Sequence, residues 1–125
     1  MAAKTRKRAV GARGALVALS TAPDVRTARR IARLLVEERL CACVNVVPAV
    51  RSIYRWKGVL HEDGELLLVL KTRRSLLAAL AKRLEVLHPY DLPELVALPA
   101  VGGLDPYLAW LERETSGAKR ARPTS

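Results

Sequence analysis

Apolar residues follow two alternating spacings along this chain, and these spacings predict strands and helices in turn. Short apolar runs at 15–19, at 66–70 and from 95 to about 101 have the length of strands. In two other segments, 24–40 and 75–88, apolar residues recur every three or four positions. That period predicts helices that bury one side.

The stretch 43–72 is rich in β-forming residues and predicts a long hairpin of two strands. Glu62-Asp63-Gly64 is the expected turn, because Asp-Gly supplies the positive φ that a tight turn needs. Pro48 donates no backbone hydrogen bond, so we expect it at an edge or a bulge that bends the first strand.

Residues at the predicted helix ends fit helix-capping preferences. Asp24 and Ser75 stand where N-caps are expected, just before the two helical segments. Asp105 and Pro106 then predict the N-cap and first position of a last short helix that reaches Thr115.

The resulting order is βαββαβ followed by a helix, which predicts an α+β fold of the ferredoxin-like sandwich class, with a long β-hairpin and a C-terminal helix. Two helices cover only one face of such a sheet. The runs 15–19, 66–70 and 95–98 are nevertheless apolar at consecutive positions, so the second face is apolar too. We therefore expect this face and the protruding hairpin to meet other copies of the chain.

The charge of +10 is concentrated at the ends of the chain. Segments 1–13 and 116–125 hold eight of the 22 basic residues and none of the 12 acidic ones, so they are predicted to be disordered basic tails that recognise no specific nucleic acid. The near-neutral remainder, 14–115, has the size of one domain and is half hydrophobic like the whole chain. No run is long and apolar enough for a membrane span.

Catalytic motifs are missing from the sequence: it holds no Gly-x-Ser-x-Gly elbow and no glycine-rich phosphate loop, so we expect no enzyme. Cys41 and Cys43 are too close for an unstrained disulfide, which favours a reducing cytoplasm. They are either small core residues or a thiol pair for a soft ion such as Cu(I). The basic start and the apolar residues after it resemble a signal peptide, but Arg13 interrupts the apolar run and Pro23-Asp24 follows where a small-residue cleavage site should be. We therefore do not expect secretion.

The remaining polar candidates each leave two interpretations open. His88 ends a predicted helix, where it either caps the helix dipole or binds a metal ion, and His61 falls in the predicted hairpin turn. Four arginines of the first predicted helix lie mostly off the apolar stripe, and they form either a solvated face or a phosphate clamp; they are Arg26, Arg29, Arg30 and Arg33.

Four of the five aromatic residues come in two pairs, in a chain without phenylalanine. One pair is spaced by two residues on the long strand and the other by three on the last helix, so each pair shares a face. They either fill an interface or line a pocket there with two polar groups. The candidate cleft residues are Tyr54, Trp56, Lys71, Glu94, Tyr107 and Trp110.

Several motifs together resemble the CutA divalent-cation tolerance proteins, in order and at the spacing of that family, across nearly all of residues 16–114. The segments that carry the resemblance are Ser-Thr-Ala-Pro-Asp at 20–24, Cys-Ala-Cys-Val-Asn-Val-Val-Pro at 41–48, Ser-Ile-Tyr-Arg-Trp-Lys-Gly at 52–58, Leu-Lys-Thr at 70–72, His-Pro-Tyr-Asp-Leu-Pro-Glu at 88–94 and Tyr-Leu-Ala-Trp-Leu at 107–111.

The resemblance implies a homotrimer with the architecture of the PII signalling proteins, and a role in tolerance of divalent metals, copper especially. In some bacterial members the proposed copper site uses a cysteine at the end of the first strand and two adjacent histidines. Here Ser20 and Leu87 stand at two of these positions, so His88 alone remains as a metal ligand. Two hypotheses follow: a trimer that binds copper or a similar ion weakly, and a PII-like module that holds a small anionic ligand between subunits.

Overall fold

The computed structural model describes residues 14–117, so the predicted tail 1–13 and all of the tail 116–125 except its first two residues lie outside the described part. The order of strands and helices is the predicted one, with one short 3₁₀ turn added. The elements are β1 (Ala15–Ala22), α1 (Val25–Glu37), β2 (Cys43–Trp56), β3 (Val59–Arg73), η4 (Arg74–Leu76), α2 (Leu77–Leu87), β4 (Val96–Pro99) and α3 (Asp105–Glu114).

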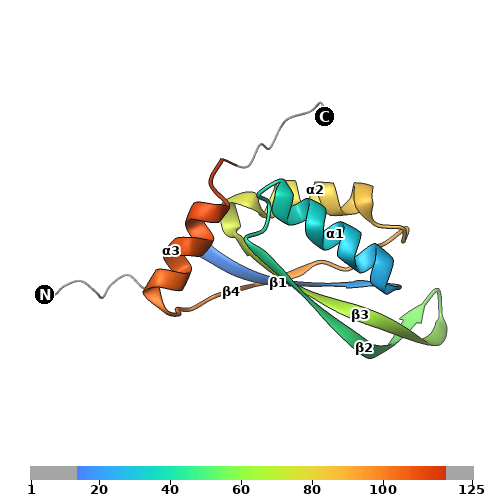
Figure 1. Ribbon diagram of the computed structural model, residues 1–125. Coiled ribbons are helices and arrows are strands. Elements are labelled where there is room, and N and C mark those ends of the chain that lie inside the picture. The colour runs from blue at the N-terminus through green and yellow to red at the C-terminus, as the bar shows by residue number, and fades with distance from the viewer. Residues whose placement is uncertain (1–13, 118–125) are drawn as a thin grey trace, which may run out of the picture.

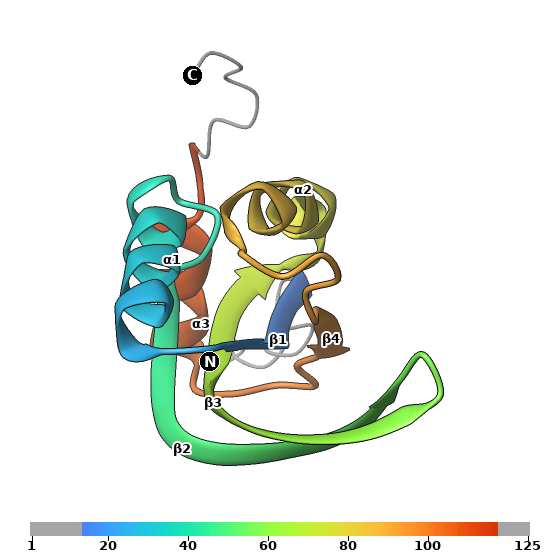
Figure 2. The same cartoon turned by 90° about the vertical axis from the view of Figure 1, so that its right-hand side faces the viewer.

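The four strands form one antiparallel sheet in the order β2-β3-β1-β4. Helices α1 and α2 lie side by side over one face, and α3 lies at one end of the sheet (Figures 1 and 2). The predicted α+β, ferredoxin-like fold is therefore confirmed. Within residues 14–117, no helix is long and apolar enough to cross a membrane.

The main core lies between the sheet and the two covering helices. Leu68 and Leu70 of β3 are fully buried, as are Ile31 and Leu35 of α1 and Leu80 of α2. Their alternation along the strand and their helical spacing are the two periods visible in the sequence. Truncating one such leucine to alanine typically costs about 2–5 kcal/mol of folding free energy.

The hairpin turn was misplaced in the sequence prediction. Glu62-Asp63-Gly64 lies inside β3, and the chain turns instead at Lys57-Gly58 between the paired residues Trp56 and Val59. Lys57 and Gly58 have φ of 51° and 79°, which is the pattern of a type I′ turn, whereas Gly64 lacks a positive φ. The second strand of the hairpin is consequently longer than predicted.

Pro48 lies where the sequence predicts it, at a break in the register between β2 and β3. The shift falls between Val47 and Val50, and Ala49 takes a φ of 61°. This bulge bends the edge strand β2, and the outer half of the hairpin projects from the sheet as an arm (Figure 2).

Helix starts agree with the sequence only in part. Asp24 is the N-cap of α1, and its Oδ1 accepts the amide N–H of Thr27 at 2.8 Å. Ser75 does not cap α2, because it lies in the 3₁₀ turn and α2 begins at Leu77 without a side-chain cap. Asp105 is the first residue of α3 rather than its cap, so the helix begins one residue earlier than predicted.

The sheet face opposite α1 and α2 is apolar, as the sequence predicts, and in the described chain it is covered only by α3 at one end (Figure 1). It presents the strand positions that alternate with those of the core, and Val96 and Leu98 are 53% and 52% exposed. We call this surface the open face. Its members are Val17, Leu19, Val47, Val69, Val96 and Leu98.

Candidate functional site

His88 lies at the C-terminal end of α2, where it is the C-cap, and its side chain is only 7% exposed. Nδ1 accepts the amide N–H of Tyr90 at 3.1 Å, so Nδ1 carries a lone pair and the ring proton is on Nε2. Nε2 therefore donates to the carbonyl oxygen of Thr21 in β1 at 2.7 Å. Both ring nitrogens are occupied within the protomer.

A chain of tyrosines and carboxylates extends from His88 to the base of the hairpin arm. The Tyr90 ring packs on His88, and its hydroxyl donates to Glu65 Oε2 at 2.7 Å. Farther out, the Tyr54 hydroxyl donates to Asp63, and the Tyr54 ring stacks on His61. These contacts connect β2, β3 and the loop after α2.

Electrostatics in this cluster keep the tyrosines protonated. Burial and the bond to Glu65 raise the pKa of Tyr90 above its ordinary value of 10. The hydrogen bond to Asp63 is the main cause of the raised pKa of Tyr54. Because the carboxylates accept hydrogen bonds from these hydroxyls, both hydroxyls act as donors rather than as bases.

Ser20 and Leu87 stand at the two positions where the resemblance implies a cysteine and a second histidine. Ser20 is fully buried, and its Oγ lacks a hydrogen-bond partner in the described structure. Leu87 is half-buried against the main core. Residues 14–117 of one protomer contain no group of three or more His, Cys, Asp or Glu side chains that could hold a metal ion.

A second polar group lies at the α3 end of the sheet. The Lys71 ammonium donates to Asn45 Oδ1 at 2.8 Å, and Cys43 pairs with Lys71 across β2 and β3. The rings of Tyr107 and Trp110 pack at a tilt of 38° with their centroids 5.3 Å apart. Burial is the main cause of the raised pKa of Tyr107, and Cys43 adds to it. Cys43 is a half-buried free thiol.

Cys41, just before β2, is fully buried in the main core. Burial, with a smaller contribution from Cys43, raises the pKa of the Cys41 thiol to about 12. This agrees with the interpretation of Cys41 as a small core residue.

The structure does not bring the six candidate cleft residues together within one protomer. Tyr54 and Trp56 lie on the hairpin arm, and α3 with the other aromatic pair lies at the opposite end of the sheet (Figure 1). Exposed Glu94 precedes β4 at the end near Thr21, whereas Lys71 lies across from Val17. Thr21 and Val17 are four residues apart, which places Glu94 and Lys71 about 13 Å from each other along β1.

Sequence reasoning missed the contacts of Asp63 and Glu65 because it placed the turn beside them. His61, Asp63 and Glu65 alternate along β3, so they share a face once the turn is moved to Lys57-Gly58. The sequence did hold a signal for the true turn, because a type I′ turn favours glycine at its second central position, where Gly58 lies. The partner of Glu65, Tyr90, is 25 residues away, and no local pattern joins them.

Comparison with known proteins places these features in a family. The model of the CutA1 divalent ion tolerance protein family matches residues 16–114. A divalent-cation tolerance protein CutA from Thermus thermophilus is 52% identical over 99 residues, which are 79% of this chain and 96% of that protein. A human protein CutA is 46% identical over 98 residues, 78% of this chain and 55% of the human protein.

Solved structures agree with the sequence comparison. The Thermus thermophilus divalent cation tolerance protein has a TM-score of 0.79 at 51% identity, and the alignment covers 81% of this chain and 98% of that one. CutA1 from Oryza sativa has a TM-score of 0.80 at 43% identity, covering 82% and 94%. The matched residues contain both polar groups and the whole hairpin arm, and the chain belongs to the CutA1 divalent ion tolerance family.

Proposed function

We propose that this chain works in the cytoplasm as a homotrimeric binding protein, without catalytic activity, whose ligand site is completed only by assembly. One observation carries the proposal: the two halves of the candidate cleft lie at opposite ends of a single protomer. A neighbouring copy can supply the missing half, since the open face and the arm are both exposed. Two free cysteines fit a reducing compartment.

The open face supports assembly on energetic grounds. Val96 and Leu98 are each about half exposed, beside further apolar residues on β1 and β3. Burying apolar surface stabilises association by about 25 cal/mol per Å². The arm carries Ile53 and Leu60, both 65% exposed, and gives a second copy an apolar surface to pack on.

Substitutions that place a charge on the open face test this assembly. Leu98→Glu is expected to convert the trimer to a monomer, because a buried unpaired carboxylate is costly. Val86→Glu on α2 is the matched control, since Val86 is 74% exposed on the helical side. If light scattering shows that Leu98→Glu is still a trimer, the open face is not part of the subunit interface.

The proposed ligand is copper or a similar divalent ion, bound weakly through His88. The family supports this choice, and the occupied ring nitrogens explain the weakness. A metal at Nδ1 must displace the Tyr90 amide, and an unsatisfied buried N–H costs about 1–3 kcal/mol. Cys43 lies at the other end of β1 from His88, so any thiol ligand comes from a neighbouring subunit.

Calorimetric titration of reduced, tag-free protein with Cu(I), Cu(II) and Zn(II) tests metal binding. The expected result is a saturable heat that His88→Ala abolishes and His61→Ala retains. Without a saturable heat, or with the same heat from His88→Ala, His88 is not a ligand.

One observation favours the alternative, a small anionic ligand held in the intersubunit cleft as in PII-like proteins. The Lys71 ammonium contacts a neutral amide oxygen and forms no ion pair within residues 14–117, so it can receive an anion. A thermal-shift screen of nucleotides and metabolites tests this ligand class. A ligand is expected to raise the melting temperature of the wild type and not that of Lys71→Ala. An equal rise in both proteins would show that Lys71 does not bind the ligand.

A further inference from the structure

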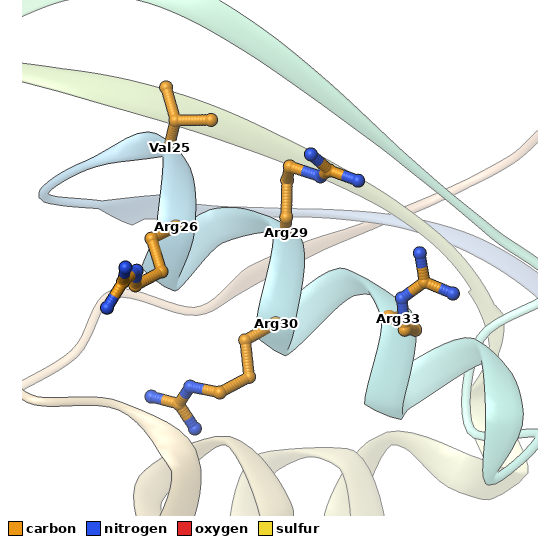
Figure 3. Close-up of a pocket in the computed structure, with 5 residues that line it drawn as sticks. All are labelled: Val25, Arg26, Arg29, Arg30 and Arg33. Atoms are coloured by element: carbon orange, nitrogen blue, oxygen red, sulfur yellow. The ribbon is translucent and has the colours of Figure 1, made fainter.

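Helix α1 carries four arginines on its solvent side, and we call Arg26, Arg29, Arg30 and Arg33 the arginine face. All four are exposed, while Ala28, Ile31 and Leu35 of the same helix are buried. Together with Val25, the arginines line an open hollow of about 500 Å³. Figure 3 shows Arg26 and Arg30 turned to one side of the helix and Arg29 and Arg33 to the other.

Little negative charge compensates this face. Asp24, just before the helix, accepts the Thr27 amide N–H and interacts electrostatically with Arg26, and the helix itself holds one acid, Glu37, at its last residue. Within residues 14–117, Arg26, Arg29 and Arg33 form no ion pair, and the segments outside contain neither Asp nor Glu. The ion pairs of the described chain are Arg39 with Glu114, Arg51 with Glu62 and Arg83 with Glu38.

The arginine face is an energetic cost to the free protein. Like charges four residues apart on a helix, such as Arg26 with Arg30 and Arg29 with Arg33, repel by a few tenths of a kcal/mol per pair. Of the four, Arg30 makes the one described hydrogen bond, at 3.3 Å to the Leu87 carbonyl oxygen, and Arg26 interacts electrostatically with Asp24. Because α1 lies on the side away from the open face, assembly through that face leaves the arginines in solvent (Figure 1).

We propose that the arginine face docks the phosphodiester backbone of nucleic acid, without reading its sequence. Each guanidinium group can bind two oxygens of a phosphate. The seven helical steps from Arg26 to Arg33 span about 10 Å, the length of about three phosphates of one strand. Aromatic residues are missing from the lining, so bases find no stacking platform. The eight basic residues in the terminal segments likewise favour a negatively charged partner.

The shape of the surface distinguishes this partner from two others. The hollow is open, so it suits an extended polyanion better than a small ligand, which needs to be mostly enclosed. A helix that inserts into a lipid surface presents its apolar side outward, whereas the apolar side of α1 is buried in the core.

Fluorescence anisotropy with a labelled duplex DNA and a labelled single strand tests the proposal, with the full chain and several salt concentrations. The variant is Arg26→Gln with Arg29→Gln and Arg33→Gln. The control lowers the net charge equally at three exposed sites without described side-chain partners, Arg74→Gln, Lys82→Gln and Arg113→Gln. Circular dichroism shows that both fold.

The triple arginine variant is expected to bind the labelled nucleic acid at least about tenfold more weakly than the wild type. The slope of log binding constant against log salt concentration should be smaller in magnitude by about two to three. The control is expected to stay within about threefold. Equal weakening by both variants, or none, would overturn the proposal, since net charge or the terminal segments would then explain binding. Stronger binding to phosphatidylserine vesicles that depends on the same arginines would overturn it in favour of a membrane.

Discussion

The hydrogen bond from Tyr90 to Glu65 should be a measurable part of the stability of this fold. Tyr90→Phe removes only the hydroxyl and leaves the Glu65 carboxylate, 9% exposed, without its donor at 2.7 Å. Hydrogen bonds to charged groups contribute about 1.5–3 kcal/mol, so we expect a loss of about 2 kcal/mol in the free energy of unfolding.

Urea denaturation at pH 7 and fixed protein concentration measures this loss, and a double-mutant cycle with Glu65→Gln isolates the pair. We expect a coupling energy of about 1 kcal/mol or more. Tyr107→Phe is the matched control, because the described structure gives the Tyr107 hydroxyl no hydrogen bond. A loss below about 0.5 kcal/mol for Tyr90→Phe, or a coupling energy near zero, would refute the reasoning.

The same pair predicts a pH dependence. Burial is the main cause of the raised pKa of Tyr90, and the hydrogen bond to Glu65 adds to it. The folded state therefore keeps the Tyr90 hydroxyl proton at a pH where the unfolded state, with its ordinary pKa of 10, loses it. The stabilisation is fully present below pH 10 and falls as the pH rises above it. The stability difference between wild type and Tyr90→Phe should therefore narrow in alkali; curves that stay parallel would contradict this assignment.

Three further outcomes follow from the described geometry. Ser20→Ala should leave stability unchanged or raise it by up to about 1 kcal/mol, because it removes a buried hydroxyl without a partner; a clear loss in urea denaturation would show a missed contact. Under native conditions a thiol reagent should modify Cys43 well before buried Cys41, whose raised pKa suppresses the thiolate; equal rates in mass spectrometry would oppose this. Gly58→Ala should cost about 1–2 kcal/mol through its positive φ, while Gly64→Ala should cost little, and the reverse order would place the turn at Gly64.

Periodicity was enough to predict the fold, since each element has one dominant apolar spacing. The stripe of α1 is regular and follows a true N-cap, Asp24, so its start was predicted to the residue. The hairpin shows the limit: Asp63-Gly64 and Lys57-Gly58 both contain a turn glycine, and local preference favoured the wrong one. Pairing of Trp56 with Val59 and the residues beyond fixes the register, and this is a property of both strands together.

The candidate site was less predictable than the fold because its contacts join distant segments. His88 was recognised as a cap or ligand, but its bond to the Thr21 carbonyl spans 67 residues. The link from Tyr90 to Glu65 depends on the hairpin register that was misplaced. The six cleft residues were identified by type and spacing, and only the sheet shows that one protomer divides them between its two ends.

Light scattering of the wild-type protein tests the central claim, that assembly completes the site, most directly. The account predicts one species near 41 kDa, three times the 13.7 kDa protomer, in the presence and absence of a chelator. A single species near 13.7 kDa would contradict it, because the open face would then lie in solvent and the two halves of the cleft would never meet.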